Sequence, residues 1–264
     1  MNQDQVKEKL LAIEDAPLDF SVIFSGKKSK KVNGLYKPET KEIVIHNRNF
    51  NDDNLLLYTA VHEYAHHLHA CIQGGKLSAR AHTSEFWAIL HNLLEKAEAR
   101  NIYRNVFTSS PELIALTETI RTKHLAENGV LVKDLGEKLL LAQELCEKIG
   151  GRFEDYIDRV LRIPRLAVMT AIKVHQYNVN PSVGPDNMRF LAGIKNEDIR
   201  AAAESALLGG KSPDTVKVAA KSQKTPAREE YPRMKLEKEK ARLERTLDSI
   251  KKRLDEIAEE LEQC

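Results

Sequence analysis

Two histidines that flank a glutamate are the residues in this 264-residue sequence best placed to do chemistry. His62, Glu63 and His66 fit the pattern H-E-x-x-H. On a helix, residues four apart lie on the same face, so both imidazoles can bind one ion. Zinc suits such a site, because it binds imidazole in tetrahedral centres that keep one position for water. Glu63, turned about 100° from His62, would lie beside the ion and could take a proton from that water. The pattern predicts one zinc ion per chain and hydrolysis of peptide bonds, with Glu63 as general acid/base.

A third protein ligand must come from another part of the chain. His69 shares the stripe of His66 but lies about 4.5 Å further along the helix axis, too far for Zn–N bonds of about 2.0–2.1 Å. His82 follows the glycine break Gly74–Gly75 and a polar loop, which lets the chain return to the ion. We therefore predict His82 as the third ligand. Glu85, one turn later, is the alternative, because glutamate also serves as a zinc ligand.

The histidine pair needs a helix, and the sequence predicts one from about residue 55 to 70. Its apolar residues recur at helical spacing, and the polar residues 51–54 offer several caps for its start. Thr83 or Ser84 can cap a later helix that continues to about residue 100. The segments before the histidine helix are predicted as a helix over residues 1–15, a strand over 19–25 and a hairpin over 32–46.

Four short segments together resemble the SprT-like and related minimal zincin metallopeptidases, over about residues 18–100. They are Gly34–Tyr36, Glu42–Ile45, His62–His67 and His82–Trp87. The resemblance implies a small sheet, an H-E-x-x-H helix and a later histidine that opens a second helix. It also implies His62, His66 and His82 as zinc ligands and Glu63 as general acid/base. Thr83 stands where glycine is common in that group, and the sequence shows no zinc ribbon of the SprT kind, so partner specificity does not carry over.

From residue 110 onward the pattern is helical almost throughout. Ser110 and Pro111 predict a helix start, and Asn128–Gly129 predicts its end. A second helix is predicted over residues 134–149. Shorter helices are expected at about 153–161, 165–177, 186–193, 196–208 and 213–221.

The helices at 153–161 and 165–177, joined by three residues, have the proportions of a helix-turn-helix and faintly resemble ParB-like and phage-regulator segments. The second of them carries four residues that could meet phosphates and base edges, namely Arg165, Thr170, Lys173 and Gln176. Residues 129–222, however, hold 14 Lys+Arg and 12 Asp+Glu, which is no strong basic stripe. DNA binding and a helical scaffold that docks proteins both stay open.

The C-terminal residues 233–264 carry a heptad pattern after a proline-containing linker, residues 223–232. Leucine and isoleucine repeat at two core positions with charges elsewhere, which predicts a coiled coil and a homo-oligomer. A single solvated helix, or one that folds back on its own domain, is the alternative.

The composition sets the broad class of the protein. The 42% hydrophobic content supports a packed core, and the net charge of +2 argues neither for nor against nucleic acid. The three cysteines are scattered, which predicts no disulfide framework. We expect a cytoplasmic location, because the sequence shows no signal peptide and no stretch long enough to cross a membrane.

These observations predict an α+β chain in four parts. They are a zincin-like domain at residues 1–108, a helical domain at 109–222, the linker at 223–232 and the coiled coil at 233–264. The predicted function is a zinc metalloendopeptidase that acts on a protein substrate and is targeted by its helical C-terminal region. The alternative is a DNA-binding or regulatory protein whose zinc domain senses or binds rather than cleaves.

Overall fold

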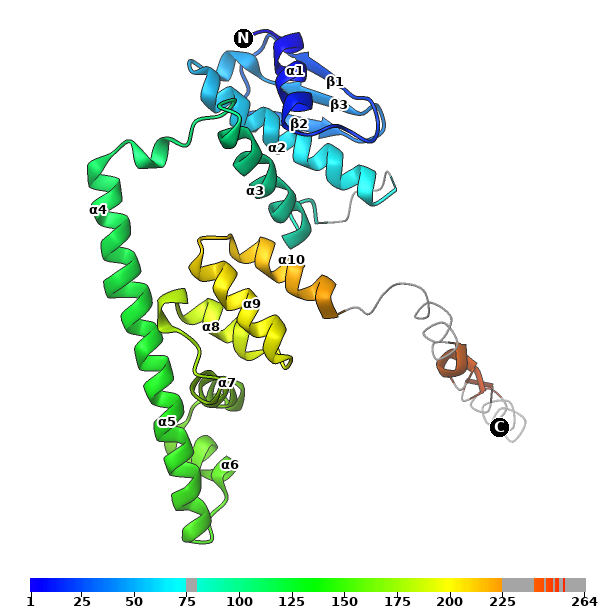
Figure 1. Cartoon of the computed structure of the whole chain (residues 1–264). Helices are drawn as coiled ribbons and strands as arrows, with labels where there is room; N and C mark the ends of the chain where they lie inside the picture. The colour runs from blue at the N-terminus through cyan, green and yellow to red at the C-terminus, as the bar shows by residue number, and fades with distance from the viewer. Residues whose placement is uncertain (75–79, 225–239, 245, 249, 252–253, 255–264) are drawn as a thin grey trace. The chain divides into compact units, whose positions relative to one another are not determined.

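The chain combines many helices with one small sheet, which confirms the α+β class (Figure 1). The computed structural model describes residues 1–74 and 80–224, together with 240–244, 246–248, 250–251 and 254. It divides into two compact units, Met1–Ala220 and Lys221–Cys264. The finer division at residue 108 stays a prediction.

Three short strands form the sheet. They are β1 (Ser21–Phe24), β2 (Gly34–Lys37) and β3 (Glu42–Ile45), in the order β1-β3-β2. β2 pairs antiparallel with β3, so the predicted hairpin over residues 32–46 is confirmed. β1 pairs with the other side of β3 in parallel, so the hairpin's second strand lies in the middle. β2 is left at an edge of the sheet, with one side open to further pairing.

Three helices accompany the sheet, namely α1 (Gln3–Ile13), α2 (Asp53–Ile72) and α3 (Ser84–Ala99). α1 contacts β1, while α2 contacts β2 and β3 and packs along α3. Ile43 and Ile45 of the central strand are fully buried, whereas Val44 between them is half-buried. This alternation places one face of the sheet against the core, as the period of two requires. The same core takes in Leu10 of α1 and Tyr64 of α2.

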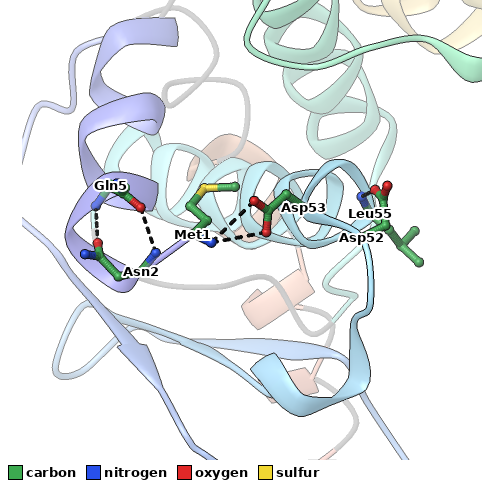
Figure 2. A network of polar contacts seen from close by, with 6 residues as sticks. All are labelled: Met1, Asn2, Gln5, Asp52, Asp53 and Leu55. Atoms are coloured by element: carbon green, nitrogen blue, oxygen red, sulfur yellow. Dashed lines mark hydrogen bonds and ion pairs between the residues drawn. The ribbon is translucent and has the colours of Figure 1, made fainter.

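Polar contacts fix the first turns of α1 and α2 (Figure 2). Asp52 caps α2, since its carboxylate accepts a hydrogen bond from the backbone N–H of Leu55 at 3.0 Å. This cap lies within the polar residues 51–54 that the sequence offered. The next residue, Asp53, lies 3.3 Å from the amino nitrogen of Met1. Asn2 and Gln5 form a reciprocal capping box at α1, with both hydrogen bonds at 2.9 Å.

The first helix of the C-terminal half is longer than predicted. α4 (Pro111–Thr119), the π-helical segment η3 (Ile120–Ala126) and α5 (Glu127–Lys148) follow one another without a break. The predicted helix end at Asn128–Gly129 is therefore wrong. The glycine serves close packing instead of a cap, because a Cβ on Gly129 would lie 2.5 Å from the carbonyl oxygen of Pro181.

The remaining helices pack on α5 and on one another. They are α6 (Phe153–Asp155) with the π-helical η4 (Tyr156–Leu161), α7 (Arg165–Gln176), α8 (Pro185–Ala192), α9 (Glu197–Leu208) and α10 (Pro213–Lys224). The chain also has the short 3-10 helices η1 (Asn47–Asn49), η2 (Val106–Thr108) and η5 (Pro181–Val183). Arg162, with φ of 55°, turns the chain between η4 and α7, so the predicted pair of helices with a three-residue joint is confirmed. Their buried clusters draw on residues 132–220 and are distinct from the core around the sheet.

Only part of the predicted coiled coil can be described. Its described residues from 240 to 254 are helical, and their heptad core positions Leu243, Leu247, Ile250 and Leu254 are 52–59% exposed. The rest of 233–264, and residues 225–232 of the predicted linker, lie outside the described residues. Pairing with a second chain stays a prediction. In the parts of the chain that the structure describes, no helix has the length and apolar character needed to cross a membrane.

We expect Gly136→Ala to destabilise the protein, although alanine normally favours a helix interior by about 1 kcal/mol over glycine. A Cβ at Gly136 of α5 would lie 2.1 Å from the carbonyl oxygen of Ala171 in α7. Overpacking of this kind costs about 1–3 kcal/mol. Urea denaturation followed by circular dichroism measures the change. Lys138→Ala, on the exposed side of the same helix, should change the unfolding free energy little, and an unchanged or raised stability for Gly136→Ala would contradict the packing.

Candidate metal centre

Three imidazoles converge on one point in the N-terminal domain. His62, His66 and His82 each offer a nitrogen, and these atoms all lie within 4.8 Å of one another. The Nε2 atom of His82 lies 3.1 Å from Nε2 of His62 and 3.2 Å from Nε2 of His66. One ring nitrogen can donate or accept a single hydrogen bond, so two contacts at His82 Nε2 exceed its hydrogen-bonding capacity. A shared cation satisfies all three nitrogens, and tetrahedral Zn–N bonds of about 2.0–2.1 Å would place them about 3.3–3.4 Å apart.

Two helices hold these ligands. His62 and His66 lie on one face of α2, four residues apart as predicted. His82 directly precedes Thr83, which caps α3 by accepting the backbone N–H of Phe86 at 3.3 Å. The structure therefore brings together the predicted His82 with the pair on α2. Glu85, the alternative third ligand, does not belong to this group, which is the one cluster among the residues described that could hold a metal ion.

Burial keeps the two helix histidines in the form that binds metals. Desolvation, together with the neighbouring imidazoles, lowers the pKa of His62 to about 4 and that of His66 to about 3. Both rings are thus neutral at pH 7, with a lone pair free for a cation. The Nδ1 atom of His66 is buried and has no hydrogen-bond partner among the described residues.

The aromatic ring of Phe86 packs against all three imidazoles. Its ring is fully buried and stacks on His66 with the centroids 4.2 Å apart. The centroids of His62 and His82 lie 5.0 and 4.8 Å from it. Trp87 stacks on the outer ligand His82 at 5.5 Å. The sequence shows Phe86 and Trp87 as a pair at the start of a helix, but only the structure reveals that they restrain the ligand rings.

Glu63 lies beside this cluster in a tight environment. Its side chain is buried, which raises its pKa to about 7, while a hydrogen bond from the backbone N–H of Tyr36 opposes that rise. The first residue of β2, Gly34, passes close above it. A Cβ on Gly34 would lie 2.9 Å from Cγ2 of Thr59, 3.0 Å from Cγ of Glu63 and 3.2 Å from its Oε1. The absence of a side chain at Gly34 therefore sets the position of Glu63. In the sequence, the glycine at the start of the predicted strand was the one signal of this close approach, and it entered only the resemblance to the minimal zincins.

The other two histidines of α2 have different partners. The Nε2 atom of His67 lies 3.0 Å from the carbonyl oxygen of Leu18, and its Nδ1 atom lies 3.0 Å from the hydroxyl of Tyr36. A carbonyl only accepts, so Nε2 carries the proton and Nδ1 accepts the Tyr36 hydroxyl. This link ties β2 to α2. His69 contacts Gln73 and is not one of the three converging histidines.

A cavity of about 430 Å³ opens in front of the metal cluster. The edge strand forms one wall with Gly34, Leu35 and Tyr36, and α2 forms the other with Tyr58 and Glu63. The cluster is thus accessible to a ligand that runs along β2.

The residues predicted to contact DNA lie on α7. Arg165 forms an ion pair with Asp158, which raises the pKa of the guanidinium and lowers that of the carboxyl. Thr170 donates its hydroxyl to the carbonyl oxygen of Leu166 at 2.7 Å. Lys173 is half-buried and Gln176 is exposed. Two of the four side chains are thus engaged within the chain, and DNA binding stays a prediction.

Comparisons of the chain with family models, curated proteins and solved structures gave no match. The geometry of the centre is therefore the basis for assigning a function.

We expect Gly34→Ala to displace Glu63 and to lower the unfolding free energy by about 1–3 kcal/mol, the range for overpacked sites. The new methyl group would meet both Thr59 and Glu63. The fluorescence of Trp87, the only tryptophan, reports unfolding of this domain in urea. Lys37→Ala, at the exposed end of the same strand, serves as the control and should change stability by less than about 1 kcal/mol. Equal effects of the two substitutions would contradict the close approach.

The metal-free domain should lose stability as the pH falls from 6.5 to 4. The folded pKa of His66 is about 3, so in this range the unfolded chain binds a proton that the folded chain does not. Linkage gives a loss of about 3 kcal/mol from this residue by pH 4. Urea titrations of Trp87 fluorescence at several pH values measure it. His66→Leu should reduce the dependence, and a slope equal to that of the wild type would contradict the burial of this imidazole.

Proposed function

We propose that this chain is a zinc-dependent metallopeptidase of the minimal zincin type, which hydrolyses peptide bonds of a protein substrate. The observation that carries the proposal is the convergence of His62, His66 and His82 beside the buried Glu63. The donor set consists of three imidazoles, which suits zinc in a catalytic centre with one position left for water.

The chain's own residues supply the proton transfers. Bound zinc would lower the pKa of a water and polarise the scissile carbonyl. Glu63 accepts the proton of the attacking water and delivers it to the leaving amine nitrogen. In the metal-free chain burial raises the pKa of Glu63 to about 7, so this carboxyl can hold a proton as well as accept one near neutral pH. The backbone N–H of Tyr36 and the close passage of Gly34 hold the carboxylate in place for both steps.

The edge strand offers a way to bind a polypeptide. β2 pairs only with β3 in the described sheet and borders the metal cavity. A substrate in extended form can add a strand to such an edge, so that main-chain hydrogen bonds position the scissile bond. The helical region and the residues 233–264 would then select the target.

A regulatory protein that senses zinc needs the three histidines but has no need for a buried carboxyl beside them. The placement of Glu63 therefore favours the peptidase over the sensor. DNA binding is not proposed, because no contact in the structure favours it.

Glu63→Gln should keep the metal and lose proteolysis. Glutamine is nearly isosteric but cannot accept a proton, and loss of a general base costs about 10²- to 10⁴-fold in rate. The measurement combines zinc content by mass spectrometry with digestion of denatured casein. Thermal unfolding of the variant verifies its fold. Cleavage at the wild-type rate by Glu63→Gln, with zinc measured in the same sample, would refute the assignment.

In the same assay, alanine at His62, His66 or His82 should lower the zinc content well below one ion per chain. Glu85→Ala is the matched control and should retain it. Zinc retained by His82→Ala but lost by Glu85→Ala would reverse the assignment of the third ligand.

A further inference from the structure

A second cavity, of about 630 Å³, adjoins the metal cavity. Tyr58 lines both cavities, so they share a wall at this residue. The second cavity is walled mainly by the apolar side chains of Leu55, Leu94, Val106 and Phe107. Its volume lies in the range of about 300–1,000 Å³ that is usual for ligand sites.

The walls of this cavity are held by hydrogen bonds within the domain. The side chain of Asn54, in the first turn of α2, donates to the carbonyl oxygen of Arg104 at 2.9 Å and accepts its backbone N–H at 2.8 Å. Tyr103 donates its own backbone N–H to the carbonyl oxygen of Ala97 at the end of α3. The segment that carries Val106 and Phe107 is thus fixed against α2. A preformed cavity binds without the entropic cost of ordering its walls.

Two apolar side chains at this cavity are unusually open to solvent. Phe107 is 65% exposed and Val106 is 40% exposed. An apolar ligand that binds in such a concave site removes the apolar side chains around it from water, and this burial contributes favourable free energy to binding. Asp52, Asn54, His91 and Arg104 also line the cavity, but most of its accessible lining surface is apolar. The lining therefore favours an apolar occupant over a charged one.

The spacing along α2 relates this cavity to the scissile bond. Tyr58 lies one turn before His62, about 6 Å along the helix axis. An extended peptide advances about 3.3 Å per residue. One or two residues of an extended peptide therefore span the distance from His62 to Tyr58.

We infer that this second cavity is a specificity site, which takes a large apolar side chain of the polypeptide substrate, of the phenylalanine or leucine class, one or two residues from the cleaved bond. The inference rests on the proposed peptidase function. The wall that the two cavities share at Tyr58 and the apolar lining of the second cavity carry it.

The first test measures binding without catalysis. The full chain, with labelled leucine and valine methyl groups, is titrated with N-acetyl-phenylalaninamide, N-acetyl-leucinamide and N-acetyl-alaninamide. The methyl resonances of Leu55, Leu94 and Val106 should shift and saturate with the first two probes, at least tenfold more tightly than with the alanine probe. Val106→Trp should fill the cavity and abolish these shifts at the two leucines. Leu11→Trp is the matched control, since Leu11 is 37% exposed on α1, away from the cavity, and it should retain them.

The second test measures specificity. The zinc-loaded wild type digests a denatured mixture of peptides, and the products are sequenced by mass spectrometry. Phenylalanine and leucine should be enriched at one position within two residues of the cut. Val106→Trp should reduce that preference at least tenfold, the lower end of what a side-chain pocket contributes to discrimination, whereas Leu11→Trp should not.

The outcomes separate the two proposals. If the wild type cleaves no peptide, the proposed function fails, and the methyl shifts still decide what the cavity binds. If it cleaves without an apolar preference, or if Val106→Trp keeps the preference, the specificity site is refuted and the peptidase stands. Methyl shifts that are absent, or equal for all three probes, refute the apolar cavity itself.

Discussion

The burial of polar side chains along α2 is the constraint on which the rest of the N-terminal domain depends. Among the described residues, the buried polar and charged side chains are Thr59, Glu63, His66, His67 and His69, all on this one helix. A buried polar group costs free energy unless it finds a partner. Thr59 and His69 find partners four residues away, at Leu55 and Gln73. The other three depend on partners from distant parts of the chain.

Three segments outside α2 supply these partners. β2 brings the hydroxyl and the backbone N–H of Tyr36 to His67 and Glu63. The segment before β1 brings the carbonyl oxygen of Leu18 to His67. The entry to α3 brings His82 to His62 and His66. Tyr36 and Leu18 satisfy the hydrogen-bonding groups of His67 and Glu63. The three imidazole nitrogens that face a common point do not satisfy one another, and this makes a cation the natural fourth member of the cluster.

Close packing sets the position of the acid/base candidate as firmly as hydrogen bonding does. Gly34 lets the edge strand pass over Glu63 within contact distance of its carboxylate oxygen. The same edge strand borders the metal cavity, and Tyr58 lines both this cavity and the apolar one. A shift of β2 would thus alter the carboxylate, the open sheet edge and the access to the centre together. Stability and the proposed chemistry are coupled through this strand.

The local features were predictable from the sequence because they depend on spacing and on residues close in the chain. The pair His62 and His66 follows from the helical period, the cap of α2 from the polar residues 51–54, and the hairpin from its alternating strands. The prediction of a helix end at Asn128–Gly129 was wrong because it relied on such a local feature. A glycine after an asparagine resembles a local stop signal, whereas Gly129 meets the backbone of Pro181, more than fifty residues later.

By itself, the sequence determined the residue types of the centre, the helix that presents two ligands and the candidates for the third. Only the tertiary structure decided that His82, and not Glu85, joins the cluster, because the approach of His82 to α2 involves packing of both against Phe86. It alone paired β1 with β3 and left β2 at the edge. It alone also placed a second, apolar cavity next to the metal centre. Helical and strand periods act over a few residues, whereas strand order, burial and cavities arise from contacts between residues far apart in the chain.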